Sequence, residues 1–186
     1  MNILLHACCG PCTIYPLSIL KSQHHDITAY FNNPNIHPYK EFKRRLDTLQ
    51  DYSKNEDFPL VIDDSYGLTE FLQLVVFKEK IRCPICYEMR LKKTVEYANE
   101  HGFDGFSTTL LYSRYQNHAV IIKICEKLAK AHSLHFVYED FRIGWQEGID
   151  LSIEKDMYRQ PYCGCIYSEQ ERYDKSLRKK IKKSVK

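Results

Sequence analysis

The chain has 186 residues, 44% of them hydrophobic and 27% charged, with a formal net charge of +3. This composition is typical of a globular protein, and the length predicts one domain with a buried core. No stretch reaches the ~20 apolar residues of a membrane helix, and the first apolar run is too short for a secretory signal. We therefore expect a cytoplasmic protein without a membrane partner.

Short apolar runs alternate with helical patterns along the first 140 residues. Runs typical of strands occupy 2–7, 27–32, 59–63, 105–108 and 134–139. Helices are predicted at 13–23 and 67–77, and from the amphipathic stripes that begin at Tyr39, Tyr87 and Val120. This alternation predicts a mostly parallel sheet covered by helices on both faces.

The alternation stops after residue 140. We expect residues 1–140 to form the α/β core, and 141–186 to form a mostly helical appendage packed over the sheet in the same compact unit. Residues 175–186 hold seven Lys and Arg and no acid, so the rest of the chain has 20 basic against 24 acidic residues. A basic tail favours an anionic partner such as RNA, although it also suits a solvated segment that aids solubility.

Seven of the eight cysteines lie in three tight groups. The groups are Cys8, Cys9 and Cys12, then Cys83 and Cys86, then Cys163 and Cys165. Because a reducing compartment disfavours disulfides, such spacing indicates metal or redox chemistry. Cys125 is the exception, since it falls among apolar residues at helical spacing and is predicted to be core.

Two cysteine groups are expected at the starts of helices. Cys8 and Cys9 follow the first predicted strand, where a parallel sheet builds its sites. Pro11 and Pro84 suit first helical turns, whose free N–H groups favour the thiolate form of nearby cysteines. Four thiolates suit zinc and an iron–sulfur cluster equally well, but a purely structural zinc would not require seven cysteines, which favours redox function.

Other polar side chains are expected near the same crevice. The candidates for substrate contact are Asn33, Asn35, His37, Tyr115, Gln116, Asp140, Arg142, Arg159 and Gln160. The candidates for contact with RNA phosphates are Lys43, Arg44, Arg45, Arg90, Lys92, Lys93, Arg178, Lys179 and Lys180. Asx turns, helix caps, local ion pairs and solvated helix faces explain many of these residues equally well.

Six motifs carry a resemblance to a known family. They are HACCGPC (6–12), NPNIHP (33–38), RCPICYEMRL (82–91), GFDGFSTTLLYSRYQ (102–116), DFR (140–142) and YRQPYCGCIYS (158–168). In this order they resemble the QueH type of epoxyqueuosine reductase. The resemblance implies an adenine nucleotide alpha hydrolase-like (HUP) fold. It also implies reduction of epoxyqueuosine to queuosine at the tRNA wobble position, the last step of queuosine biosynthesis, without cobalamin.

The resemblance further implies a 4Fe-4S cluster held by Cys8, Cys9, Cys83 and Cys86, with a second, mononuclear iron nearby. Cys163 and Cys165 would be a catalytic redox pair or ligands of that iron. Cys12 would join them as a catalytic residue, at a position where relatives can carry aspartate, which leaves the second ligand set open. The electron donor is not identified.

The glycine- and serine-rich loop by which many HUP relatives bind ATP is replaced by CCGPC, so no ATP is expected. A zinc-stabilised RNA-binding module and an ATP-dependent tRNA-modifying enzyme of the HUP class are the alternatives.

Overall fold

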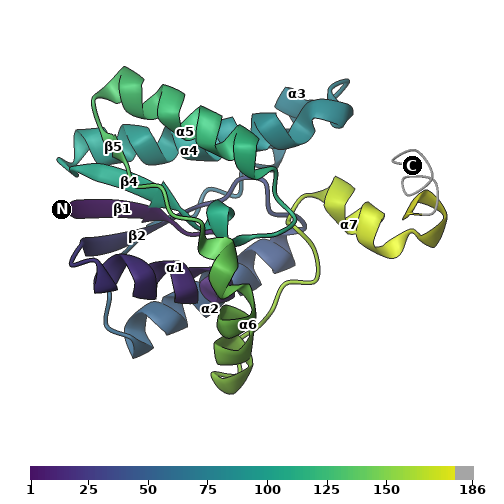
Figure 1. The fold of residues 1–186 in the computed structure, drawn as a ribbon. Coiled ribbons are helices and arrows are strands. Elements are labelled where there is room, and N and C mark those ends of the chain that lie inside the picture. Colours follow the sequence, from purple (N-terminus) through teal and green to yellow (C-terminus); the bar gives the residue numbers. More distant parts are fainter. Residues whose placement is uncertain (179–186) are drawn as a thin grey trace.

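The computed structural model describes residues 1–178, which form a five-stranded parallel sheet with helices on both faces (Figure 1). The strands are β1 (Asn2–His6), β2 (Asp26–Asn32), β3 (Leu60–Asp63), β4 (Gly105–Thr108) and β5 (His135–Phe136), in the spatial order β3-β2-β1-β4-β5. This arrangement confirms the predicted parallel α/β class.

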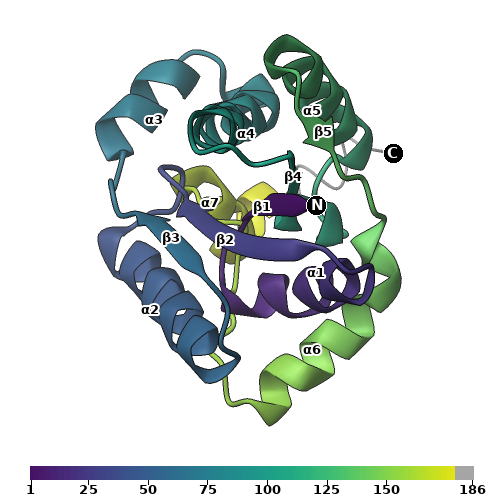
Figure 2. The same ribbon diagram turned by 90° about the vertical axis from the view of Figure 1, so that its left-hand side faces the viewer.

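The helices are α1 (Gly10–Ser22), α2 (Tyr39–Asn55), α3 (Leu68–Val75), α4 (Arg82–Glu100), α5 (His118–His132), α6 (Trp145–Glu154) and α7 (Ile166–Tyr173). Three short 3-10 turns connect them: η1 (Glu79–Ile81), η2 (Thr109–Tyr112) and η3 (Phe141–Gly144). In Figure 2, α1, α2 and α6 lie on one side of the sheet, and α3, α4 and α5 lie on the other. None of the helices within residues 1–178 has both the length and the hydropathy to cross a membrane.

The central strand is apolar on both faces because both faces are covered. Leu4 of β1 packs with Tyr30 and Ala98 on the α4 side, whereas Ile3 and Leu5 join the main core on the other. All three β1 residues are fully buried, as a continuous apolar run in a parallel sheet predicts. Cys125 is also fully buried, which confirms its prediction as core.

The fifth strand is shorter than its predicted range of 134–139. It can pair only with β4, because it lies at the edge of the sheet. The last backbone bond runs from the N–H of Val137 to the oxygen of Phe106, and β4 turns into η2 at Thr109. With no further partner, the chain leaves the sheet. Residues 141–178 are mostly helical, as predicted, and α6 packs against α1.

β2 and β4 pair with opposite edges of β1, so the direction in which strands are added to the sheet reverses at β1. In parallel sheets this reversal opens a crevice beyond the carboxyl ends of the central strands. The crevice here is bordered by residues that follow β1 and β4, which places the CCGPC motif at the position where such folds bind ligands.

Candidate metal and substrate site

Three thiols meet at the end of β1. The sulfur atoms of Cys8, Cys9 and Cys12 all lie within 4.8 Å of one another, the one such group of potential metal ligands found among the described residues. Cys9 is the N-cap of α1, and Pro11 lies in its first turn, as predicted. The backbone N–H of Cys8 donates to Oγ1 of Thr109 at 3.1 Å, which ties the group to the end of β4. The local sequence thus produces a compact thiol cluster at the crevice.

The three thiols are not equivalent. Hydrogen bonding with Cys12 and Cys9 holds the pKa of Cys8 well below its usual value. The hydrogen bond with Cys8 raises the pKa of Cys12, and burial raises that of Cys9. Gln160 bridges Cys9 and Cys12, since its Oε1 accepts from Cys9 and its Nε2 donates to Cys12, each at 3.2 Å. Of the three thiols, Cys8 therefore loses its proton most readily, and a bound metal would displace the protons of the other two.

The other four cysteines form a second group. Cys83 lies in the first turn of α4, Cys86 lies at the start of its second turn, and Cys165 is the N-cap of α7. Burial raises the pKa of Cys83 and Cys86, to about 12 for Cys86, and the charges of Cys163 and Cys165 raise both further. Cys86 and Cys165 share a small apolar cluster with Phe71 and Val75. The turn that carries Cys163 and Cys165 therefore lies beside the start of α4.

The ligand set that the resemblance implies takes two cysteines from each of these groups. The structure joins Cys8 and Cys9 with Cys12, and it joins Cys83 and Cys86 with the Cys163–Cys165 turn. Within the described chain, the four expected cluster ligands are not all within 4.8 Å of one another. The cysteines lie near the starts of α1 and α4, as the sequence predicts. Which cysteine groups come together is determined by the loops between the elements.

Arg90 lies between the two groups. Its guanidinium is 2% exposed, and its positive charge interacts with Cys86, Cys163 and Cys8. Nε donates to the backbone oxygen of Cys86 at 3.2 Å, whereas Nη2 has no partner among residues 1–178. Arg90 also lines the cleft described below, so burial removes it from the outer surface but not from the site. The site therefore contains a buried cation with a free donor, which suits an anionic group.

A cleft of about 590 Å³ connects the thiols to solvent. Its lining includes residues expected at the site, namely Cys8, Cys12, Tyr115, Gln116, Arg159, Gln160, Cys163 and Arg178. Nε2 of Gln116 donates to the sulfur of Cys163 at 3.0 Å, and its Oε1 accepts from the hydroxyl of Tyr87 at 2.7 Å. The volume falls within the range of small-molecule sites.

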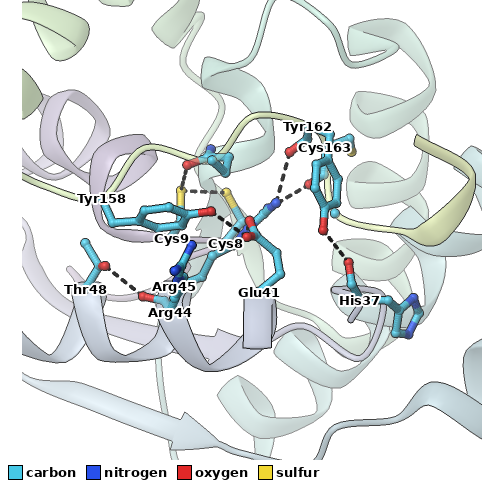
Figure 3. A network of polar contacts seen from close by, with 12 residues as sticks. Cys8, Cys9, His37, Glu41, Arg44, Arg45, Thr48, Tyr158, Tyr162 and Cys163 are labelled. Carbon is cyan, nitrogen blue, oxygen red and sulfur yellow. Dashed lines mark hydrogen bonds and ion pairs between the residues drawn. The ribbon is translucent and has the colours of Figure 1, made fainter. Parts of the chain in front are cut away.

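A buried ion pair on α2 positions the turn that carries Cys163 (Figure 3). Nε of Arg45 and Oε1 of Glu41 are 2.7 Å apart, and the two side chains are 1% and 7% exposed. The guanidinium also donates to the backbone oxygens of Cys163 at 2.8 Å and Tyr162 at 2.9 Å. Its donors therefore point inward, which contradicts the expected contact of Arg45 with RNA.

The loop before α2 supports the same turn. The Tyr162 hydroxyl donates to the His37 oxygen at 2.6 Å (Figure 3). The His37 N–H donates to the Gly164 oxygen at 2.8 Å. A Cβ on Gly164 would lie 3.1 Å from Nδ2 of Asn35. Asn33, fully buried, donates to the oxygen of Ala7 at 2.9 Å. Asn35 and His37 thus lie against the turn and Asn33 lies against the end of β1, and none of the three lines the cleft, contrary to the expectation of substrate contact.

The remaining candidates lie outside the cleft or beyond the described residues. Asp140 and Arg142 form a local ion pair at 2.6 Å and do not line the cleft. Lys43 and Lys92 pair with Asp47 and Glu96 on exposed helix faces. Arg44 lies over the Tyr158 ring, and Lys93 is exposed. Lys179 and Lys180 fall outside residues 1–178.

Two contributors were missed at the sequence level. Glu41 stands four residues before Arg45, a spacing that signals a helical ion pair. Trp145, the single tryptophan of the chain, follows the DFR motif closely and lines the cleft. Nothing in the sequence shows that Glu41 pairs with the arginine that binds the Cys163 turn, or that Trp145 lines the cleft.

The chain is similar to a set of named proteins. A family model described as "Epoxyqueuosine reductase QueH" matches residues 3–171. A protein of that name from Dehalococcoides mccartyi is 38% identical over 174 residues, covering 94% of this chain and 96% of the relative. Another from Thermotoga maritima is 31% identical, covering 94% of this chain and 93% of the relative.

One solved structure supports the fold. A "predicted subunit of tRNA methyltransferase" from Methanocaldococcus jannaschii superposes with a TM-score of 0.52 at 13% identity, covering 83% of this chain and 75% of that one. At such low identity the likeness concerns the fold alone.

Proposed function

Because this chain belongs to the epoxyqueuosine reductase QueH family, a family of oxidoreductases, we propose that it reduces epoxyqueuosine to queuosine at the wobble position of tRNA. The observation that carries the proposal is the three-thiol group at the switch point of the sheet, within a cleft that also contains Cys163. A cleft of this size with thiols at its base suits a small polar group presented by a larger substrate.

We further propose that the site binds a 4Fe-4S cluster through Cys8, Cys9, Cys83 and Cys86. The donor chemistry fits, because thiolates are the ligands of such clusters and these cysteines flank helix starts. The free donor of buried Arg90 also fits, since an anionic cluster would supply its missing partner. When bound, the cluster supplies single electrons and a Lewis-acidic iron for the epoxide oxygen.

The Cys163–Cys165 pair matches the electron demand of the reaction. Converting an epoxide to an alkene with loss of water consumes two electrons and two protons. Oxidation of one dithiol to a disulfide releases that number, and an external donor then restores the dithiol. Because Cys163 is exposed and lines the cleft, it is accessible both to substrate and to a reductant. Gln116 donates a hydrogen bond to its sulfur.

The tRNA would enter the cleft with the modified nucleotide turned out of the loop. Tyr115, Gln116, Arg159 and Gln160 are the proposed substrate contacts, because they line the cleft. Arg178 at the rim, the exposed Lys43, Arg44, Lys92 and Lys93, and the basic tail are the proposed phosphate contacts.

Metal analysis of anaerobically purified protein tests the cofactor. We expect a brown protein with about four iron and four sulfide per chain, bleached by dithionite. Cys83→Ser should lose the cluster, whereas the matched control Cys125→Ser, in the core and outside the site, should retain it. A colourless wild type that contains only zinc would contradict the cluster and favour an RNA-binding module instead. A reductase assay on epoxyqueuosine-containing tRNA then tests the activity.

A further inference from the structure

We propose that Tyr115 and Trp145 form a stacking platform for an RNA nucleobase at the mouth of the thiol cleft. The inference rests on the proposed tRNA substrate and adds the subsite that receives one of its bases. Both aromatic side chains line the cleft. Tyr115 follows η2 and is 85% exposed, whereas Cys12, which lines the same cleft, is buried. The platform is therefore the part of the wall that an entering RNA meets first.

The platform is rigid on one side and open on the other. The Trp145 ring packs against Tyr112 with centroids 5.1 Å apart, and the Tyr112 hydroxyl donates to the Trp145 oxygen at 2.9 Å. The Tyr115 ring meets Trp145 edge to face, with centroids 5.7 Å apart and an interplanar angle of 79°. An edge-to-face contact leaves a broad face of the tyrosine ring available, because only one ring uses its face in such a pair.

Positive charge surrounds the two rings. The Arg114 guanidinium lies 5.8 Å from the Trp145 ring centroid. Arg159, Arg172 and Arg178 line the same cleft, where Glu171 is the one acidic residue among the described lining side chains. Glu171 is itself paired with Arg82. Aromatic faces interleaved with guanidinium groups suit bases and phosphates of a single-stranded segment. This density of arginine does not suit the binding of an apolar peptide.

The platform predicts stacking without base-specific readout, because every base offers a flat face. Replacing the ring of Tyr115 should weaken RNA binding about 5- to 150-fold, the range that follows from one lost base–aromatic stack. It should not change the slope of affinity against salt concentration, because no phosphate contact is removed. These two readouts distinguish stacking from a purely electrostatic contact.

The single tryptophan makes the test specific. Anaerobically purified protein is titrated with an unmodified anticodon stem-loop RNA, and binding is followed by Trp145 fluorescence and by anisotropy of labelled RNA. We expect quenching in the wild type, weakened binding with Tyr115→Leu, and near wild-type binding with Tyr115→Phe, which retains the ring. Tyr138→Leu is the matched control, since Tyr138 is 45% exposed but does not line the cleft.

The outcomes separate the two levels of the proposal. Unchanged affinity of Tyr115→Leu, together with intact reductase activity, would overturn the platform and leave the function standing. A wild-type protein that binds no stem-loop would overturn the tRNA substrate and the platform together. Weakened binding with a shallower salt slope would assign Tyr115 to the electrostatic contact and also overturn stacking.

Discussion

Replacing Arg45 with methionine should destabilise the protein strongly and release the turn that carries Cys163. The guanidinium is 1% exposed and makes three hydrogen bonds, one to Glu41 and two to the backbone of the turn. Methionine retains most of the apolar stem but leaves the Glu41 carboxylate buried with the Tyr158 hydroxyl as its remaining side-chain partner among the described residues. Removing one partner of a buried pair costs about 3–5 kcal/mol, which is the loss expected here.

Guanidinium chloride unfolding of wild type and Arg45→Met, at the same metal loading, measures the stability difference. Arg142→Met is the matched control, because its ion pair with Asp140 is partly exposed and should contribute far less to stability. Adding Glu41→Gln to Arg45→Met removes the stranded charge and should recover part of the loss. Alkylation of Cys163 should also be faster in Arg45→Met, because two bonds to its turn are gone.

A loss below about 1 kcal/mol for Arg45→Met would refute this reasoning, since an exposed pair would produce the same value. Equal effects of Arg45→Met and Arg142→Met would do so as well. Arg45→Lys keeps the charge but not the forked donors, so it should fall between wild type and Arg45→Met.

Three further predictions follow from the geometry. Burial, with the nearby Arg90 charge, lowers the pKa of His6 from 6.5 to about 4, so the unfolded chain binds the proton first. This contribution to the free energy of unfolding should therefore be fully present above pH 6.5, and it should fall by about 1.4 kcal/mol per pH unit toward pH 4. In a series of denaturant unfolding experiments across this pH range, His6→Gln should reduce the pH dependence. An unchanged pH dependence in His6→Gln would contradict the burial argument. Gly67→Ala should cost more than Gly102→Ala in thermal unfolding, because both have positive φ but only Gly67 would place a Cβ against Pro34, at 2.2 Å; equal losses would exclude the clash. Deleting residues 175–186 should weaken stem-loop RNA binding and reduce its salt dependence, because seven cationic residues are removed; an unchanged slope would return the tail to a solubilising role.

Local sequence patterns were sufficient to predict the helices and strands, and to predict the edge of the sheet at which the site lies. The run from Ile3 to Leu5 is apolar at every position because β1 is covered on both faces, and this is visible in the sequence. Pro11 and Pro84 mark helix starts because proline lacks the N–H that a first turn does not need. Parallel strands end at one edge, so the position of Cys8 and Cys9 in the crevice also followed from the sequence alone.

The grouping of the thiols and the direction of the arginines depended on tertiary structure. Cys163 and Arg45 are 118 residues apart, and their contact exists because the turn after α6 returns over the start of α2. The same basic residues that a helix pattern assigns to solvent can be drawn inward when a neighbouring segment offers carbonyl oxygens and thiols, as happens to Arg45 and Arg90. Sequence periodicity reports which face of a helix is apolar, but it carries no information on which distant loop will cover that face.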